Sequence, residues 1–210
     1  MTLLLSIQMN SSTHSLPTIS STLLKYYETL FSHFGPQHWW PADTPFEVMV
    51  GAILTQNTNW QNVEKAICQL RRRKLLSPRA LLVAPHRKIA SAIRSSGYFN
   101  VKAKRLKSFV KWFVGNYGGS IRKMRTQDPA RLRLELLSVS GIGQETADSI
   151  LLYALRFPYF VVDTYTKRIL ERHALARGDY ARLQKFFHDN LPHDVRLYNE
   201  YHALIVATGT

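Results

Sequence analysis

The sequence predicts an all-α fold. Apolar residues recur three and four positions apart along most of the chain, which is the period of helices with one buried face. Proline, glycine and short polar stretches interrupt this pattern at intervals typical of helix ends. Only residues 159–162 (Tyr-Phe-Val-Val) read as a convincing extended run, and a lone short strand makes no sheet. We expect about ten helices.

The first part of the chain predicts a tail followed by two helices. Residues 1–20 are rich in Ser and Thr and show no sustained period, so a loose N-terminal tail is expected. An apolar stripe from Leu23 to Phe34 predicts the first helix. After a loop that carries two tryptophans, Thr44, Pro45 and Glu47 form a capping-box pattern, which predicts the start of a buried helix.

The middle and end of the chain predict the remaining helices. Thr58 is expected to cap a helix through residues 60–70, and short helices are expected near 78 and over 86–94. A loop at 97–100, with Asn100 as a cap, precedes a basic amphipathic helix over 101–116 that ends at Gly118 and Gly119. Helices over 130–137 and 144–155 flank a Gly-Ile-Gly turn, and Pro158 breaks the second of them.

Composition indicates a polyanionic partner. The 210 residues can bury a core as one domain or as two small lobes that share a cleft. Twenty-eight Lys and Arg against 14 Asp and Glu give a formal charge of +14, for which nucleic acid is the commonest partner. A merely solvated surface is the alternative. An acidic membrane is less favoured, because the basic clusters lie on several separate segments rather than on one amphipathic helix.

Cysteine and histidine usage argues against disulfides and metals. Cys68 is the only cysteine, so the chain can build neither a disulfide framework nor a four-cysteine metal site. None of the eight histidines shows metal-ligand spacing. We find no secretory leader and no segment long enough to span a bilayer, so a cytoplasmic, monomeric protein that does not bind a membrane is expected.

The Gly-Ile-Gly turn is the strongest local motif. Gly141, Ile142, Gly143 and Gln144 open an apolar helix, and free amides at a helix start suit a phosphate. An ordinary turn between helices is the alternative. Lys102 could meet phosphates from the basic helix, although a solvated face would need no such role.

Several motifs in order resemble the helix-hairpin-helix superfamily of DNA glycosylases, of which endonuclease III is the type. The resemblance covers residues 23–209 and rests on the hairpin 139–143 with 146–147, on residues 162–164 (Val-Asp-Thr), on 54–56 (Leu-Thr-Gln), and on 97–103. It implies two helical lobes with damaged double-stranded DNA bound in the cleft between them. One lobe would be residues 41–158, with the hairpin at 136–155, and the other residues 21–40 and 159–210.

The resemblance also implies roles for single residues. Asp163, 20 positions past Gly143, would face the sugar of a flipped nucleotide, and Gln56 would fill the gap left in the duplex. An ionised carboxylate suits this chemistry, because breaking an N-glycosidic bond develops positive charge on the sugar. On local sequence alone Asp163 could equally be a helix N-cap, and the two roles are compatible.

Two departures from family patterns bear on the mechanism. Bifunctional members carry a Schiff-base lysine two positions after the second hairpin glycine, where this chain has Glu145. Adenine glycosylases carry a glutamate four residues before the Gln-x-Thr element, where this chain has Ala52. The sequence therefore predicts excision by water without strand cleavage, and a base that needs no protonation because it is already cationic.

A tryptophan-rich set resembles the bacterial 3-methyladenine DNA glycosylase branch of the superfamily. Trp39, Trp40, Pro41 and Trp60 match the residues that line its base pocket. Aromatic faces favour a cationic purine by stacking, worth roughly 1–3 kcal/mol, and by cation–π attraction of about 0.5–2 kcal/mol. Neighbouring tryptophans also often simply pack a core.

The resulting prediction is a monofunctional DNA glycosylase for alkylated purines in base-excision repair, without a cofactor. The chain ends at Thr210, before the four-cysteine loop that holds an iron-sulfur cluster in endonuclease III relatives, and the 3-methyladenine branch does without one. A glycosylase for oxidised or mismatched pyrimidines and a non-catalytic helix-hairpin-helix DNA-binding module are the rival readings.

Overall fold

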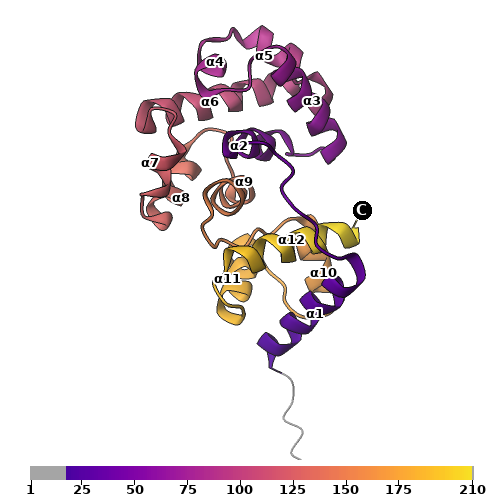
Figure 1. The fold of residues 1–210 in the computed structure, drawn as a ribbon. Helices are drawn as coiled ribbons and strands as arrows, with labels where there is room; N and C mark the ends of the chain where they lie inside the picture. Colours follow the sequence, from indigo (N-terminus) through magenta and orange to yellow (C-terminus); the bar gives the residue numbers. More distant parts are fainter. Residues whose placement is uncertain (1–17, 210) are drawn as a thin grey trace, which may run out of the picture.

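The computed structural model describes residues 18–209, which form an elongated all-helical molecule (Figure 1). No strand occurs among these residues, as the sequence predicts. In chain order the helices are α1 (Ile19–Phe34), α2 (Pro45–Leu54), α3 (Trp60–Arg72), α4 (Pro78–Val83), α5 (His86–Ala92), η1 (Arg94–Ser96), α6 (Phe99–Tyr117), α7 (Ile121–Arg125), α8 (Pro129–Ser138), α9 (Gln144–Ser149), η2 (Ile150–Leu155), α10 (Thr164–Arg172), α11 (Tyr180–Asn190) and α12 (Val195–Gly209).

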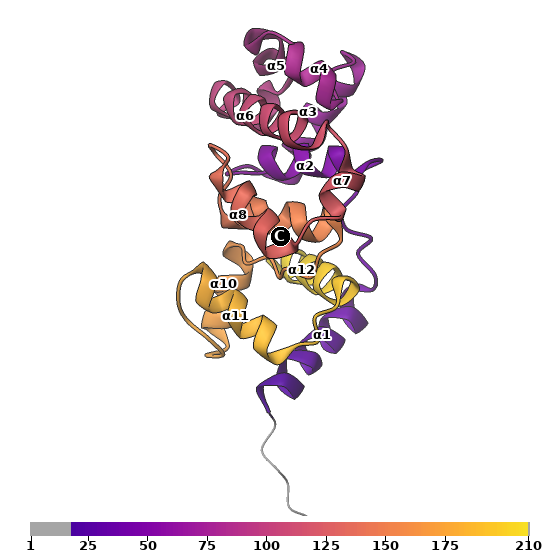
Figure 2. The ribbon, with the colours of Figure 1, turned by 90° about the vertical axis from the view of Figure 1, so that its left-hand side faces the viewer.

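The helices are arranged along the long axis in two groups that meet at α2, α9 and η2. One end holds α3 to α6, and the other end holds α1, α10, α11 and α12 (Figures 1 and 2). The first helix of the described chain therefore packs against the last, and the chain then crosses to the other group through residues 35–44. Contacts of η2 with both α2 and α12 join the groups.

Both groups share one continuous apolar core. Phe46 of α2 stacks with Phe113 of α6 at 6.0 Å between ring centroids, and Phe160 stacks with Phe187 of α11 at 3.7 Å. The four rings are buried. Because both ends of the molecule draw on one core, the residues between them are held at fixed positions.

The first helices differ from the predicted caps in detail. α1 begins at Ile19 with Thr18 as its N-cap, so it takes in part of the predicted tail, and residues 1–17 lie outside the described range. Thr44 caps α2 by accepting from the amide of Glu47 at 3.1 Å, as predicted. Glu47 does not reach back to close the box, because its carboxylate takes two hydrogen bonds from Arg71 at 2.9 Å.

Two further caps are displaced from the predicted residues. Asn59, not Thr58, caps α3 by accepting from Asn62 N at 3.0 Å, because Thr58 Oγ1 accepts from the Asn62 side chain instead. α6 begins at Phe99, with Tyr98 before it in the left-handed region at φ 42°, so Asn100 lies inside the helix. Glycines 118 and 119, both at positive φ, follow its end as predicted.

The predicted helix over 144–155 is continuous but changes type, from α in α9 to π in η2. Beyond it, the extended run at residues 159–162 has its backbone groups bonded by side chains of α11. Phe160 N donates to His188 at 3.0 Å, and Gln184 donates to Phe160 O at 2.7 Å. These bonds explain why an extended sequence pattern needs no partner strand here.

Candidate active site

Asp163 caps α10 and keeps one carboxylate oxygen free of hydrogen bonds. Its Oδ1 accepts from Thr166 N at 2.7 Å and from Thr166 Oγ1 at 2.9 Å. Its Oδ2 lies 3.5 Å from Nε2 of His202, which is too long for a hydrogen bond. The side chain is only 15% exposed. The cap therefore fixes the carboxylate through one oxygen and leaves the other available to a ligand.

The surroundings keep this carboxylate ionised. Burial acts to raise the pKa of Asp163, but the nearby His202 and the two hydrogen bonds from Thr166 outweigh it, so the pKa lies below its usual value. A partly buried negative charge is thus present at neutral pH. The sequence left open whether Asp163 is a cap or a charged site residue, and its geometry accommodates both roles.

A cavity of about 170 Å³ opens beside Asp163. Its volume exceeds what a single water needs. Aromatic rings and polar groups from several helices line it: Trp39, Trp40, Ala52, Thr55, Thr58, Asn59, Trp60, Glu145, Thr146, Ser149, Val161, Asp163, Tyr165, His202 and Val206. An apolar wall beside a few convergent polar groups is the usual character of a ligand site.

Three tryptophans form a cluster at this wall. The ring centroids of Trp39, Trp40 and Trp60 lie 5.0–5.2 Å apart, so the rings pack against one another while they line the cavity. Trp40 also lies against Gly51 of α2, where an added Cβ would come within 3.1 Å of the indole. The indole N–H groups of Trp39 and Trp40 are buried without a hydrogen-bond partner.

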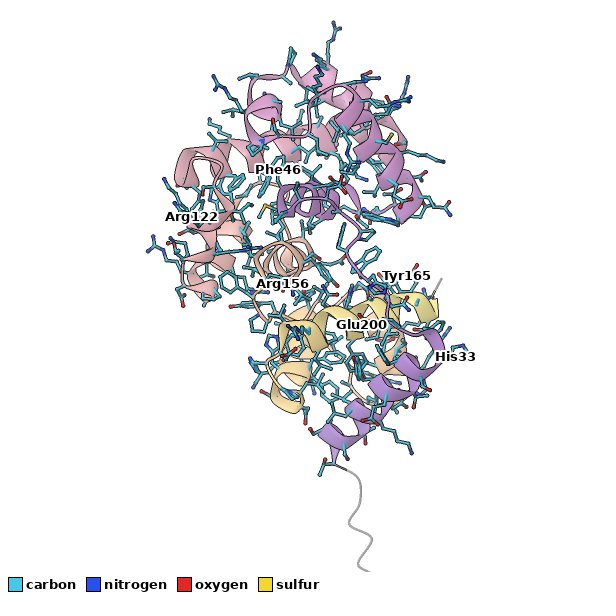
Figure 3. The ribbon with its side chains drawn as sticks, in the orientation of Figure 1. His33, Phe46, Arg122, Arg156, Tyr165 and Glu200 are labelled. Atoms are coloured by element: carbon cyan, nitrogen blue, oxygen red, sulfur yellow. The ribbon has the colours of Figure 1, made fainter. Side chains whose placement is uncertain are left out.

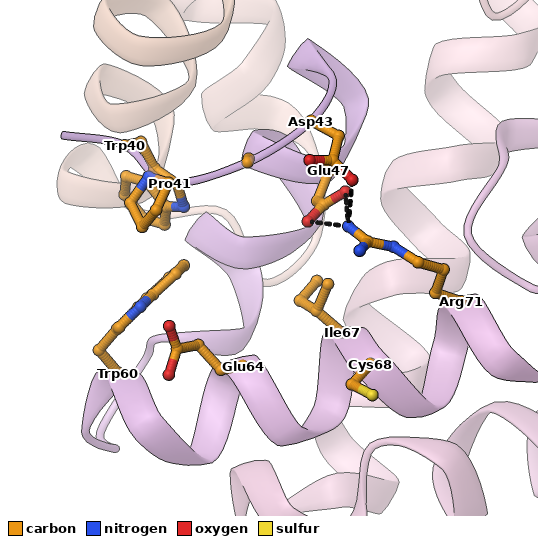
Figure 4. Close-up of a pocket in the computed structure, with 10 residues that line it drawn as sticks. Trp40, Pro41, Asp43, Glu47, Trp60, Glu64, Ile67, Cys68 and Arg71 are labelled. Carbon is orange, nitrogen blue, oxygen red and sulfur yellow. Dashed lines mark hydrogen bonds and ion pairs between the residues drawn. The ribbon is translucent and has the colours of Figure 1, made fainter. Parts of the chain in front are cut away.

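Pro41 does not join this wall. It lines a separate outer cavity of about 410 Å³, on which Trp40 and Trp60 also border (Figure 4). Asp43 and Glu47 meet Arg71 there, with Arg71 Nη2 2.7 Å from Asp43 and 2.9 Å from Glu47. Asp163 is not part of this cavity. The structure thus does not bring Pro41 to the cavity beside Asp163, where the sequence predicted it.

Glu145 and Ala52 both line the cavity beside Asp163. Glu145 sits at its rim, where protein packed around the carboxyl and then the negative charge of Asp163 raise its pKa. Ala52 is buried and offers only a methyl group. The two positions singled out by sequence thus face the same space, one as an acid and one without any polar group.

The Gly-Ile-Gly turn is built on a left-handed glycine. Gly141 has φ 89°, and a Cβ there would come within 2.3 Å of Arg105 Cγ, so only glycine fits. Ile142 is buried and anchors the turn. Gly143 begins α9 without any side-chain cap, which leaves the first amides of the helix facing outward beside the exposed Gln144.

Gln56 is bound to this turn. Its Nε2 donates to Gly141 O at 3.1 Å and to Thr146 Oγ1 at 2.9 Å, and its Oε1 accepts from Arg105. The predicted wedge residue and the predicted phosphate grip are therefore brought together, although they lie 85 positions apart. Both face a larger open cleft of about 750 Å³ that Asp163 also borders.

The sequence predicted Lys102 as a phosphate-binding cation, but Lys102 does not line this cleft. Lys102 is only 1% exposed, and its ammonium donates to Leu54 O at 2.8 Å and Ser96 O at 2.5 Å. Burial, and then the charge of Arg105, lower its pKa to about 8. Lys102 therefore ties two helix ends together and cannot reach a phosphate. Arg105 lines the cleft in its place, with Lys167 and Arg168 of α10.

Sequence reasoning missed three residues of the site. Tyr153 of η2 lies 2.5 Å from His202, and its ring centroid lies 5.2 Å from that of Trp40. Tyr165 lines both the cavity and the cleft, where the upper and lower helices meet (Figure 3). Tyr153 and His202 lie 49 positions apart and meet only in the folded protein, so no local pattern marks them. Tyr165 had one local signal, its position two residues past Asp163.

Neither a metal site nor a membrane span is found among the described residues. No group of three or more His, Cys, Asp or Glu within residues 18–209 could hold a metal ion. Over the same range, no helix has the length and apolar character needed to cross a membrane.

Comparison with known proteins identifies the family. Residues 50–193 match the model of the HhH-GPD superfamily of base excision DNA repair proteins, which covers the helices that carry the turn, Gln56 and Asp163. The chain belongs to this superfamily. The resemblance seen in the sequence is thereby confirmed, and with it the all-α helix-hairpin-helix fold. The protein is a DNA N-glycosylase of base-excision repair.

Two curated relatives illustrate the similarity. The chain is 49% identical over 187 residues to the "Putative DNA repair glycosylase MJ1434" of Methanocaldococcus jannaschii, which covers 88% of this chain and 85% of the relative. It is 32% identical over 128 residues to endonuclease III of Thermotoga maritima, which covers 61% of this chain but only 56% of that protein.

Solved structures show the same fold. The 3-methyladenine DNA glycosylase (MagIII) of H. pylori, bound to 1,N6-ethenoadenine, superimposes with a TM-score of 0.80 at 28% identity, covering 90% of this chain and 96% of that one. A trapped endonuclease III–DNA covalent intermediate superimposes with a TM-score of 0.75 at 21% identity, covering 89% and 84%. The second likeness concerns the fold alone.

Proposed function

We propose that this glycosylase hydrolyses the N-glycosidic bond of alkylated purines of the 3-methyladenine type, with Asp163 as the essential carboxylate. One observation carries the proposal: the ionised carboxylate and three tryptophan rings line the same 170 Å³ cavity. A flipped base would enter the cavity beside the rings, and its sugar would then lie over Oδ2 of Asp163. The similarity to the 3-methyladenine glycosylase of H. pylori supports this reading.

The cavity favours a base that is already cationic. Its walls offer aromatic faces, which attract a cation more strongly than a neutral ring. Ala52 supplies no proton to a leaving purine. An alkylated purine needs none, because its positive charge already weakens the bond to the sugar. Stacking and charge together would then select the damaged base over a normal one.

Hydrolysis follows from the residues around the sugar position. Asp163 stabilises the positive charge that develops on the sugar and orients the attacking water through Oδ2. Glu145 occupies the position of the Schiff-base lysine, and a carboxylate forms no imine. We therefore propose a monofunctional enzyme that leaves an abasic site in an intact strand.

The DNA would lie across the cleft between the two helix groups. The amides at the start of α9 would grip a phosphate near Gly141, Ile142, Gly143 and Gln144, and Arg105, Lys167 and Arg168 would add charge. Gln56 would fill the gap left by the flipped base. The lobes of this proposal are residues 41–158 on one side and residues 21–40 with 159–210 on the other.

A panel of duplexes with single lesions tests the proposal. The first duplex carries an alkylated purine, the second an oxidised pyrimidine, the third a mismatched pyrimidine, and the fourth is undamaged. Strand breaks in each duplex are scored with and without hot alkali. The proposal predicts alkali-dependent breaks at the alkylated purine alone. Breaks at the pyrimidine lesions would favour the endonuclease III-type rival, and binding without any break would favour a non-catalytic DNA-binding module.

A further inference from the structure

His202 of α12 lines the cavity beside Asp163 and has a different neighbour at each ring nitrogen. Nδ1 lies 2.5 Å from the hydroxyl of Tyr153, and Nε2 lies 3.5 Å from Oδ2 of Asp163. The side chain is 8% exposed, and Nε2 has no hydrogen-bond partner. A buried imidazole with one nitrogen 3.5 Å from an ionised carboxylate is placed to interact with that charge.

The Tyr153 hydroxyl determines where the ring proton lies. Burial, and then the charge of Asp163, raise the pKa of Tyr153 well above its usual value, so the phenol keeps its proton. When the phenol donates a hydrogen bond to Nδ1, a neutral imidazole must carry its own proton on Nε2. The N–H then points at Oδ2 of Asp163.

A protonated ring gives the same orientation. An imidazolium carries a proton on each nitrogen, so Nδ1 donates to the phenol oxygen and Nε2 still presents N–H to Asp163. The remaining arrangement, with a bare Nε2 lone pair against the carboxylate, is electrostatically unfavourable. Tyr153 can act as donor or acceptor and so accommodates both favourable states.

We propose that His202 is a positioning residue for base excision: it directs Nε2–H at Oδ2 of Asp163, and Tyr153 holds the imidazole in the state that does so. The inference rests on the proposed function of Asp163. Thr166 holds Oδ1 from the α10 side, and His202 faces Oδ2 from α12. The carboxylate is thus held between two helices.

Other charges near the pair act in known directions. Burial and then Asp163 raise the pKa of Glu145, on α9, whereas His202 and Lys167 lower it, so these four groups form one electrostatic cluster. Burial, and then the charges of Asp163 and Glu145, raise the pKa of Tyr153, on η2. His202 and the two hydrogen bonds from Thr166 lower the pKa of Asp163 and so favour its charged form.

Three variants test the inference. His202→Leu removes the N–H, His202→Gln keeps an N–H donor, and Tyr153→Phe removes only the hydroxyl. Tyr198→Phe is the matched control, because Tyr198 is a buried tyrosine whose hydroxyl has no hydrogen-bond partner and which lies outside the site. Far-UV circular dichroism and thermal unfolding confirm that each variant is folded.

The readouts are the pH profile of single-turnover base release from methylated duplex DNA, and the pKa of Asp163 in free protein by carboxyl ¹³C NMR. For His202→Leu we expect release to fall about 10- to 100-fold. We also expect the acidic limb and the carboxyl pKa to rise by about one unit or more, because burial of Asp163 is then less well opposed. His202→Gln and Tyr153→Phe should give smaller shifts in the same direction, and the control none.

The outcomes separate this inference from the proposed function. If wild-type protein releases no base from methylated DNA, the proposed function fails, whereas the NMR comparison still decides whether His202 tunes Asp163. If His202→Leu is folded but leaves both the acidic limb and the carboxyl pKa unchanged, the inference is overturned even where release slows. Equal effects of His202→Leu and His202→Gln on the pKa would overturn it too.

Discussion

Asp163 caps α10 and, in the proposed function, is also the essential carboxylate; Asp163→Asn separates the two roles. The cap depends on Oδ1, which accepts from Thr166 N at 2.7 Å and Thr166 Oγ1 at 2.9 Å. Asparagine keeps an oxygen at that position and is as good an N-cap as aspartate. What it loses is the negative charge next to the cavity. We therefore expect the substitution to remove the proposed chemistry and to leave the helix start in place.

The magnitudes follow from this geometry. Because the cap bonds survive, we expect Asp163→Asn to change the free energy of unfolding by about 1 kcal/mol or less. Loss of a preorganised charge at the reacting sugar should slow base release by about 100-fold or more. Asp163→Ala is the matched variant, since it loses both the charge and the cap and should unfold about 0.5–2 kcal/mol more easily.

The assay compares both variants with wild type in three measurements. Single-turnover release of methylated bases reports chemistry, duplex binding at fixed salt reports the DNA grip, and chemical denaturation reports stability. We expect Asp163→Asn to bind DNA like wild type and to release almost no base. Undiminished release by Asp163→Asn would refute the assigned role, and lost binding together with lost stability would make the residue a structural one.

Three further predictions concern other residues of the site. Gly51→Ala should displace the Trp40 indole, weaken substrate binding and cost about 1–3 kcal/mol of stability. Gly115→Ala is the control and should stabilise α6, because no atom lies within 4 Å of the new Cβ. Equal denaturation midpoints for the two variants would contradict this prediction. Glu145→Lys should let borohydride trap a protein–DNA adduct that wild type does not form, and trapping of wild type would contradict the hydrolytic mechanism. Burial lowers the pKa of Lys102 from 10.5 to about 8, so between these pH values the unfolded chain keeps a proton that the folded protein has lost. The free energy of unfolding of wild type, relative to that of Lys102→Met, should therefore rise from pH 8 to 10.5. A stability difference that stays constant over this range would contradict the prediction.

Local patterns in the sequence predicted most of the fold, because they depend on residues close together in the chain. The apolar stripes, the Thr44 cap and the glycine pair that follows α6 need no knowledge of distant partners. The predicted caps were wrong where a distant or competing group binds the capping residue. Glu47 accepts from Arg71 of the next helix instead of closing the capping box, and Asn59 caps α3 in place of Thr58.

Sequence indicated the site residues that belong to ordered motifs. The glycines of the turn and Asp163, 20 positions past Gly143, fall in this class. Lys102 did not, because helical spacing shows that a lysine is on a helix but not which face is buried, and its ammonium lies inside on two carbonyls. The role of His202 could not be predicted for a related reason. Its partner Tyr153 lies 49 positions away in the sequence and contacts it only in the folded protein.

The most direct test of the central claim is to incubate wild-type protein with methylated double-stranded DNA and identify the released bases by chromatography. The account predicts free 3-methyladenine in the supernatant and abasic sites in strands that stay intact until alkali is added. Release of no methylated purine, or strand breaks that appear without alkali, would contradict it.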